Sequence, residues 1–147
     1  MVGGRVEKKR WEYLPHTADA AFNAYGKTLE EAYSNAALAM ANITFDTTTI
    51  KPQQQKEINV TGDSTRELLI AFLDEFVFLQ DTEGFLLHEI NILTIKKGFP
   101  WKLHAIVTGD HYKNYTMHGQ LVKAVTSHEM RIEEKEHAYK VHVVVDI

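Results

Sequence analysis

The chain contains no cysteine in its 147 residues. This absence excludes disulfide bonds, thiolate nucleophiles and cysteine-based zinc sites, and it fits a reducing compartment. No stretch approaches the run of about 20 apolar residues that a membrane-spanning helix needs. Residues 1–5 lead into charged residues rather than into the apolar core of a signal peptide. We therefore expect a soluble, cytoplasmic protein with no membrane partner.

Basic residues are also in short supply, because 16 Lys and Arg stand against 20 Asp and Glu and the formal net charge is −4. Proteins that bind nucleic acid without sequence preference use an excess of basic side chains to neutralise phosphates. We expect no non-specific nucleic acid binding by this chain, although a local basic patch could still exist. If RNA enters its biology, we expect a partner to hold it.

The length indicates one domain of ordinary size. Residues 1–9 are small, basic and unpatterned, and we interpret them as a flexible lead-in to a single domain over residues 10–147. Short strands are predicted at residues 11–13 and 19–25, with Pro15 confining the turn between them.

Two helices are predicted from capping boxes, in which a Ser or Thr precedes a Glu by three residues. Thr28 and Glu31 begin the first helix, over residues 29–42. Ser64 and Glu67 begin the second, whose wide apolar stripe comprises Leu68, Leu69, Phe72, Leu73, Phe76 and Leu79.

The rest of the chain shows a polar connection at residues 44–55, expected to be exposed, and alternating apolar residues typical of strands. These strands are predicted around residues 58–60 and at 86–94, 102–108, 122–133 and 138–146. We therefore predict an α+β fold, with two helices packed on a largely antiparallel or mixed sheet of about six to seven strands in a single two-layer domain.

Two enzyme-like motifs are incomplete. Residues 21–28 nearly match a phosphate-binding P-loop, but Ala21 stands where the pattern requires Gly. No Gly-x-Ser-x-Gly motif surrounds a serine, and Ser127 and His128 are strand neighbours whose side chains point to opposite faces. We predict no intrinsic catalytic residue.

A hard-cation site is suggested at the end of the chain. Asp146 ends an apolar strand and stands beside the terminal carboxylate of Ile147. A third carboxylate could come from Asp19, with His16 near it as a possible supporting residue. Oxygen donors favour Ca²⁺ or Mg²⁺ over zinc. The alternative is that Asp146 is a solvated strand end and Asp19 a turn acid.

Lys123 is predicted on a strand, on the face that also carries Val125. A lysine among apolar strand residues lies either beside an acidic site or at a sheet edge, where it prevents aggregation. Both interpretations remain open.

Taken together, these segments resemble the archease family from about Trp11 to Ile147. The resemblance rests on His16-Thr17-Ala18-Asp19, Gly26-Lys27-Thr28-Leu29-Glu30-Glu31, the Leu68-Leu69 helix, Lys123-Ala124-Val125-Thr126 with His128, and the closing Asp146-Ile147. It implies a non-enzymatic activator of an RtcB-type tRNA ligase, which promotes GTP- and metal-dependent guanylylation of the ligase and its multiple turnover in tRNA splicing. Such a protein would meet tRNA only through the ligase.

By the same resemblance, Asp19 and Asp146 match the family's metal-binding acids, Ile147 its terminal residue and Lys123 a functionally important lysine. Ser127 departs from the tyrosine common in the family, and the segment 109–120 is short, which weakens any transfer of a role to His118. Two alternatives remain: a chaperone-like modulator of a tRNA-modifying enzyme, such as a methyltransferase, and a small metal-dependent hydrolase.

Overall fold

The computed structural model describes residues 9–15 and 19–147. Most of the predicted lead-in and His16 lie outside these residues. The helices are α1 (Leu29–Asn42) and α2 (Thr65–Glu83), and the strands are β1 (Trp11–Leu14), β2 (Ala20–Gly26), β3 (Gln54–Gly62), β4 (Phe85–Lys96), β5 (Trp101–His111), β6 (Ala124–Lys135) and β7 (Ala138–Asp146). In the described chain no helix combines the length and the apolar character needed to cross a membrane.

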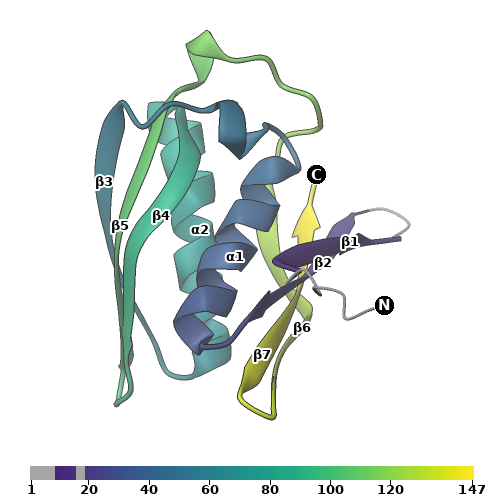
Figure 1. The fold of residues 1–147 in the computed structure, drawn as a ribbon, viewed down its shortest axis with the longest axis vertical. Coiled ribbons are helices and arrows are strands. Elements are labelled where there is room, and N and C mark those ends of the chain that lie inside the picture. The colour runs from purple at the N-terminus through teal and green to yellow at the C-terminus, as the bar shows by residue number, and fades with distance from the viewer. Residues whose placement is uncertain (1–8, 16–18) are drawn as a thin grey trace, which may run out of the picture.

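The strands form two antiparallel sheets, with the orders β1-β2-β7-β6 and β3-β5-β4. Helices α1 and α2 lie between the sheets and contact both of them (Figure 1). The prediction of an α+β domain with two helices and antiparallel strands is confirmed. The prediction of one sheet in a two-layer domain is corrected, because the strands divide between two sheets and enclose the helices.

The composition of α1 explains this enclosed position. Eight of its residues are buried, namely Ala32, Tyr33, Asn35, Ala36, Ala37, Leu38, Ala39 and Met40. They cover most of the helix circumference, whereas a helix at the surface of a two-layer fold buries one stripe. The small alanine side chains let strands approach α1 from two sides.

Both predicted helix starts are confirmed. Thr28 Oγ1 accepts the Glu31 backbone N–H at 3.1 Å, and Glu31 Oε1 in turn accepts the Lys27 backbone N–H at 2.8 Å. The same cap begins α2, where Ser64 Oγ accepts the Glu67 N–H at 3.1 Å. Helix α2 ends at Gly84, whose φ of 64° is a left-handed conformation that glycine adopts without strain.

The connection between α1 and β3 is not the exposed segment that its polar sequence predicts. Thr44, Phe45, Thr47 and Ile50 are buried. Phe45 and Ile50 form a small second core with Leu86 of β4. The prediction is wrong here because a few apolar residues without periodicity are enough to seat a loop on a neighbouring strand. The connection therefore holds the C-terminal end of α1 in place.

Candidate functional site

The strand register brings Asp19 and Asp146 together. Strands β2 and β7 pair antiparallel with Ala20 opposite Val145, so Asp19 stands opposite Asp146 when this register is continued by one residue. Directly opposed residues of antiparallel strands have Cβ atoms about 4.5–5.5 Å apart. Because Val145 faces the main core, Asp146 belongs to the other face of the sheet. The two predicted acids thus meet at one end of the four-stranded sheet.

Lys123 lies at the same end, directly before a third strand. Strand β6 begins at Ala124, which pairs with Asp146, and the Lys123 backbone N–H donates to the Asp146 carbonyl at 2.8 Å. Lys123 itself precedes the strand and its side chain is exposed, whereas Val122 is buried. The prediction that Lys123 lies within a strand is corrected, because the ladder with β7 begins one residue later.

The last residue is held against the protein. Ile147 is partly buried and packs against the main core, and it follows Asp146 at the end of β7 (Figure 1). A packed Ile147 side chain fixes the backbone that carries the terminal carboxylate. The predicted donors Asp19, Asp146 and Ile147 therefore share one end of the sheet.

The C-terminal end of α1 borders this site. Asp19 and residues 42–43 line the same hollow, of about 350 Å³. A helix C-terminus carries a partial negative charge, and the last turn of α1 contains no basic residue to offset it. The helix end and Asp19 therefore give this hollow a negative character, which suits a cation.

Two side chains that sequence reasoning did not assign to the site satisfy the carbonyls at this helix end. The Tyr13 hydroxyl donates to the Ala39 carbonyl at 2.8 Å, and burial raises the pKa of that hydroxyl to about 12, so it stays a neutral donor. His118 Nε2 lies 2.8 Å from the Asn42 carbonyl. Because a carbonyl oxygen only accepts, Nε2 carries the hydrogen. No local sequence pattern connects Tyr13 or His118 with residues 39–42.

The segment that leads to Lys123 is fastened to the residues after α1. The backbone N–H groups of His118 and Gly119 both donate to the Thr44 carbonyl, at 2.8 and 3.3 Å. The Thr44 hydroxyl donates to the Gln120 carbonyl at 2.6 Å. The position of Lys123 therefore depends on contacts that hold the segment before it against α1.

The backbone of Gly119 approaches the backbone of Ile43 closely, and this gives a testable prediction. A Cβ atom on Gly119 would lie 2.0 Å from the Ile43 carbonyl oxygen, a backbone atom that cannot move aside alone. Gly119→Ala is therefore expected to displace this segment and lower the free energy of unfolding by about 1–3 kcal/mol. Thermal unfolding measures the change.

The matched control is Gly98→Ala, because a Cβ atom on Gly98 has its nearest neighbour at 3.4 Å. This variant should melt close to the wild type. Equal melting temperatures for Gly119→Ala and the wild type would show that the segment does not depend on this close approach.

The remaining candidate residues lie elsewhere. His128 is in the irregular part of β6, where the pairing with β7 shifts between Thr126 and Arg131, and its Nε2 is 3.6 Å from a Glu129 oxygen. Among residues 9–15 and 19–147, no three His, Asp or Glu side chains lie close enough together to hold a metal ion. A site built on Asp19 and Asp146 thus needs a further donor, such as the terminal carboxylate.

Comparison with known proteins identifies the family of this chain. The family model described as "Archease protein family" matches residues 11–147. The chain belongs to the archease family. The match includes Asp19, Lys123 and the two last residues.

Archeases of known sequence match nearly the whole chain. Protein archease of Pyrobaculum islandicum is 36% identical over 139 residues, which are 93% of this chain and 95% of that protein. Protein archease of Methanosarcina mazei is 32% identical over 142 residues, which are 95% of this chain and 97% of that protein.

Two solved structures share the fold. The solution structure of protein 1598 of Methanobacterium thermoautotrophicum has a TM-score of 0.81 at 33% identity and covers 94% of this chain and 99% of its own. An archease of Thermotoga maritima, whose description adds "possible chaperone", has a TM-score of 0.61 at 19% identity, with 98% and 99% covered. The two-sheet fold described above is thus the archease fold.

Proposed function

We propose that the protein is an accessory activator of an RtcB-type tRNA ligase, promoting the GTP-dependent guanylylation of that enzyme and its multiple turnover during tRNA splicing. One observation carries the proposal. Asp19, Asp146 and Lys123 lie at the same end of one sheet, at or next to the ends of the neighbouring strands β2, β7 and β6. Membership of the archease family supports the choice of partner.

The donor set at this end fits a divalent cation. Two aspartates, a terminal carboxylate and the negative end of α1 offer hard oxygen atoms and negative charge, and the chain has no cysteine. Such donors favour Ca²⁺ or Mg²⁺. Asp19, Asp146 and Ile147 would hold the ion, which would offset phosphate charge when bound.

Lys123 supplies positive charge beside these acids. Its backbone N–H donates to the Asp146 carbonyl, which places the start of this exposed side chain at the same end of the sheet. A compact ammonium group meets a phosphate oxygen as a point charge. We propose that Lys123 either holds the metal-free carboxylates together or contacts a phosphate of the ligase's nucleotide.

The test is the labelling of an RtcB-type ligase with radioactive GTP. Substoichiometric amounts of this protein are expected to accelerate formation of the guanylylated ligase, because an activator that dissociates after each event serves many ligase molecules. The protein alone should incorporate no label and release no phosphate from GTP. A labelling rate that does not change on adding the protein, with the ligase of the same organism, would contradict the proposal.

The two alternative functions, a metal-dependent hydrolase and a chaperone-like modulator of a tRNA-modifying enzyme, predict different results when the same protein preparation is assayed. A small metal-dependent hydrolase would turn over a substrate without any partner. A chaperone-like modulator of a tRNA methyltransferase would alter methyl transfer and leave guanylylation of the ligase unchanged.

A further inference from the structure

The hairpin between β4 and β5 concentrates positive charge. Its residues 96–102 read Lys96-Lys97-Gly98-Phe99-Pro100-Trp101-Lys102, with three lysines and no acid in a chain whose formal net charge is −4. We call this segment the lysine hairpin. It lies at the lower end of the molecule in Figure 1, well below the C-terminus. The charge is therefore separate from the site at Asp146.

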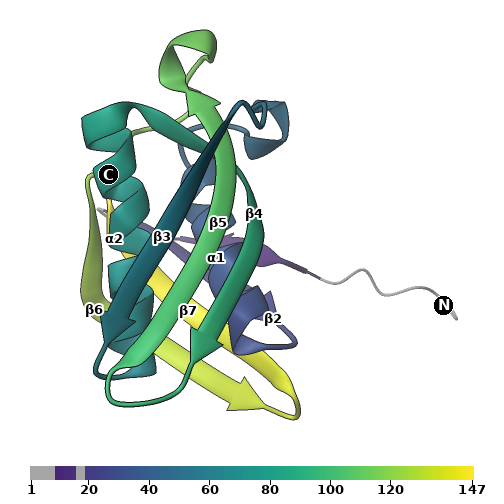
Figure 2. The same ribbon diagram turned by 90° about the vertical axis from the view of Figure 1, so that its left-hand side faces the viewer.

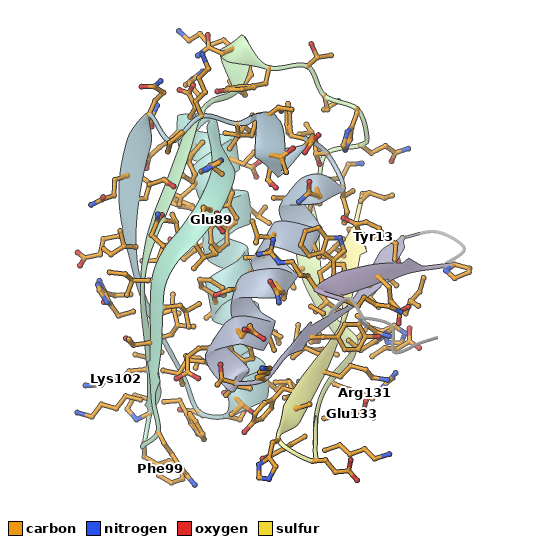
Figure 3. The ribbon with its side chains drawn as sticks, viewed as in Figure 1. Tyr13, Glu89, Phe99, Lys102, Arg131 and Glu133 are labelled. Atoms are coloured by element: carbon orange, nitrogen blue, oxygen red, sulfur yellow. The ribbon has the colours of Figure 1, made fainter. Side chains whose placement is uncertain are left out.

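The tip of the lysine hairpin exposes an aromatic ring. Phe99 is 98% exposed, far more than any other large apolar side chain of the described residues, and it points away from the body of the protein (Figure 3). Behind it, the Lys97 ammonium lies 5.9 Å from the centre of the Trp101 ring. Phe99 contributes nothing to the core, so folding does not explain a phenylalanine at this position.

The lysines are placed at a cost to the fold. Lys96 and Lys102 are directly opposite each other in the β4–β5 register, and like charges at such positions repel. Within residues 9–15 and 19–147, neither lysine nor Lys97 has an ion-pair partner. An anion bound from outside would relieve this repulsion.

Polar side chains continue the surface along the outer face of the three-stranded sheet, which no helix covers (Figure 2). The register places Asn59 and Thr94 on either side of His104, and Thr61 beside Lys102. These residues and Lys96 line a shallow hollow of about 370 Å³. Further along the sheet, Glu57 accepts a hydrogen bond from His104 at 2.9 Å and limits the basic region.

We propose that the lysine hairpin and the adjoining outer sheet face bind single-stranded RNA. The lysines would contact phosphates, a base would stack on the exposed Phe99 ring, and the Asn and Thr side chains would meet base edges or 2′-hydroxyl groups. The net negative charge of the whole chain does not prevent RNA binding, because the phosphates would be attracted by the three lysines of the hairpin.

Single-stranded RNA fits these residues better than two other anionic partners. A duplex keeps its base faces stacked, so the Phe99 ring would have no counterpart. An anionic membrane binds surfaces with a broad apolar face, whereas Phe99 is the one large exposed apolar side chain in the lysine hairpin. The inference does not depend on ligase activation.

The test is fluorescence anisotropy with a labelled oligouridylate of about 12 nucleotides and the full chain. Three lysines are expected to give a salt dependence with a slope of about −2 in log K against log[salt], and Lys102→Glu should reduce the steepness by about 0.7 or more. Phe99→Ala should weaken binding by about five- to 150-fold, the effect of losing one stacked base. Phe99→Ala should melt like the wild type, since its side chain is exposed, whereas Lys102→Glu should melt at or slightly above the wild-type temperature, because the change removes the repulsion from Lys96.

The controls use the same changes elsewhere on the protein. Lys51→Glu alters charge equally at another exposed lysine, and Phe78→Ala removes an aromatic side chain that is 56% exposed on α2. Both should bind the oligonucleotide like the wild type. The proposal is overturned if the wild type does not bind at about 50 mM salt, if Phe99→Ala and Phe78→Ala bind equally, or if phosphatidylserine vesicles bind the hairpin while RNA does not.

Discussion

Asp146→Asn is expected to weaken Ca²⁺ binding by at least about tenfold, and Asp19→Asn should do the same. Each change removes one negative oxygen donor from a set of three, and loss of even a supporting residue outside the ligand set costs about 10–100-fold in other metal sites. Isothermal titration calorimetry of the metal-free protein measures the affinity. Blocking the carboxylate of Ile147 with a C-terminal tag should have a comparable effect, because the third predicted donor would become a neutral amide.

Stability measurements separate this role from a structural one. Two carboxylates on directly opposed strand positions repel when no cation lies between them. Asp146→Asn removes that repulsion without changing the shape of the side chain, so the metal-free variant should melt at or slightly above the wild-type temperature. Addition of Ca²⁺ should then raise the wild-type melting temperature more than that of the variant.

Asp81→Asn is a matched control, since Asp81 is an exposed acid on α2. It should bind Ca²⁺ like the wild type. Equal affinities in the wild type, Asp19→Asn, Asp146→Asn and the tagged protein would remove the metal site from the proposed function.

The helices were predictable because their signals are local. The capping pair Thr28 and Glu31 and the apolar spacing after it lie within about four turns of chain, and α1 has the predicted bounds. The same holds for the start of α2 at Ser64. A cap and a helical period report on neighbours in sequence, so one sequence contains the information.

The division into two sheets was not predictable in this way, because pairing joins residues far apart in the chain. Strand β2 pairs with β7, more than a hundred residues later, while β3 pairs with β5 in the other sheet. Period-two alternation identifies a strand and its buried face but leaves its neighbour open. The burial of Phe45 and Ile50 against β4 is likewise a long-range contact.

In the candidate site, too, some residues could be predicted from the sequence and others could not. Asp19, Asp146 and Lys123 were identified as residues, and the register of β2, β7 and β6 then placed them at one end of a sheet. The contributions of Tyr13 and His118 depend on hydrogen bonds to the end of α1, which lies 26 residues from Tyr13 and 76 from His118. Contacts of that range leave no mark on the local pattern.

Lys123→Ala is expected to lower the rate of activated ligase guanylylation by about tenfold to a thousandfold. The estimate follows from the loss of a single electrostatic donor to charge that develops in a transition state. The position supports it: the Lys123 N–H donates to the Asp146 carbonyl, so Lys123 lies at the same end of the sheet as Asp146, and its side chain is exposed. Single-turnover labelling with radioactive GTP at saturating activator measures the rate.

Two companion variants identify the physical cause. Lys123→Arg keeps the positive charge but replaces the compact ammonium group by a wider, planar one, so it should retain more activity than Lys123→Ala. Lys140→Ala removes a partly exposed lysine of the same sheet, near the start of β7, where Lys140 pairs with Glu133 at 3.3 Å. Because this end of the strand is remote from Asp146, Lys140→Ala should activate the ligase like the wild type.

The competing explanation is that Lys123 protects the open edge of β6, the last strand of its sheet, from aggregation. That role predicts the reverse pattern: Lys123→Ala would aggregate or melt earlier, and the fraction that stays folded would activate fully. An exposed lysine with a functional role contributes little to folding, so its removal should shift the melting temperature by no more than about 2 °C. The melting temperature and the rate of activated guanylylation, measured on one preparation of Lys123→Ala, therefore distinguish the two roles. Full activation by a folded Lys123→Ala protein would show that the ammonium group takes no part in guanylyl transfer.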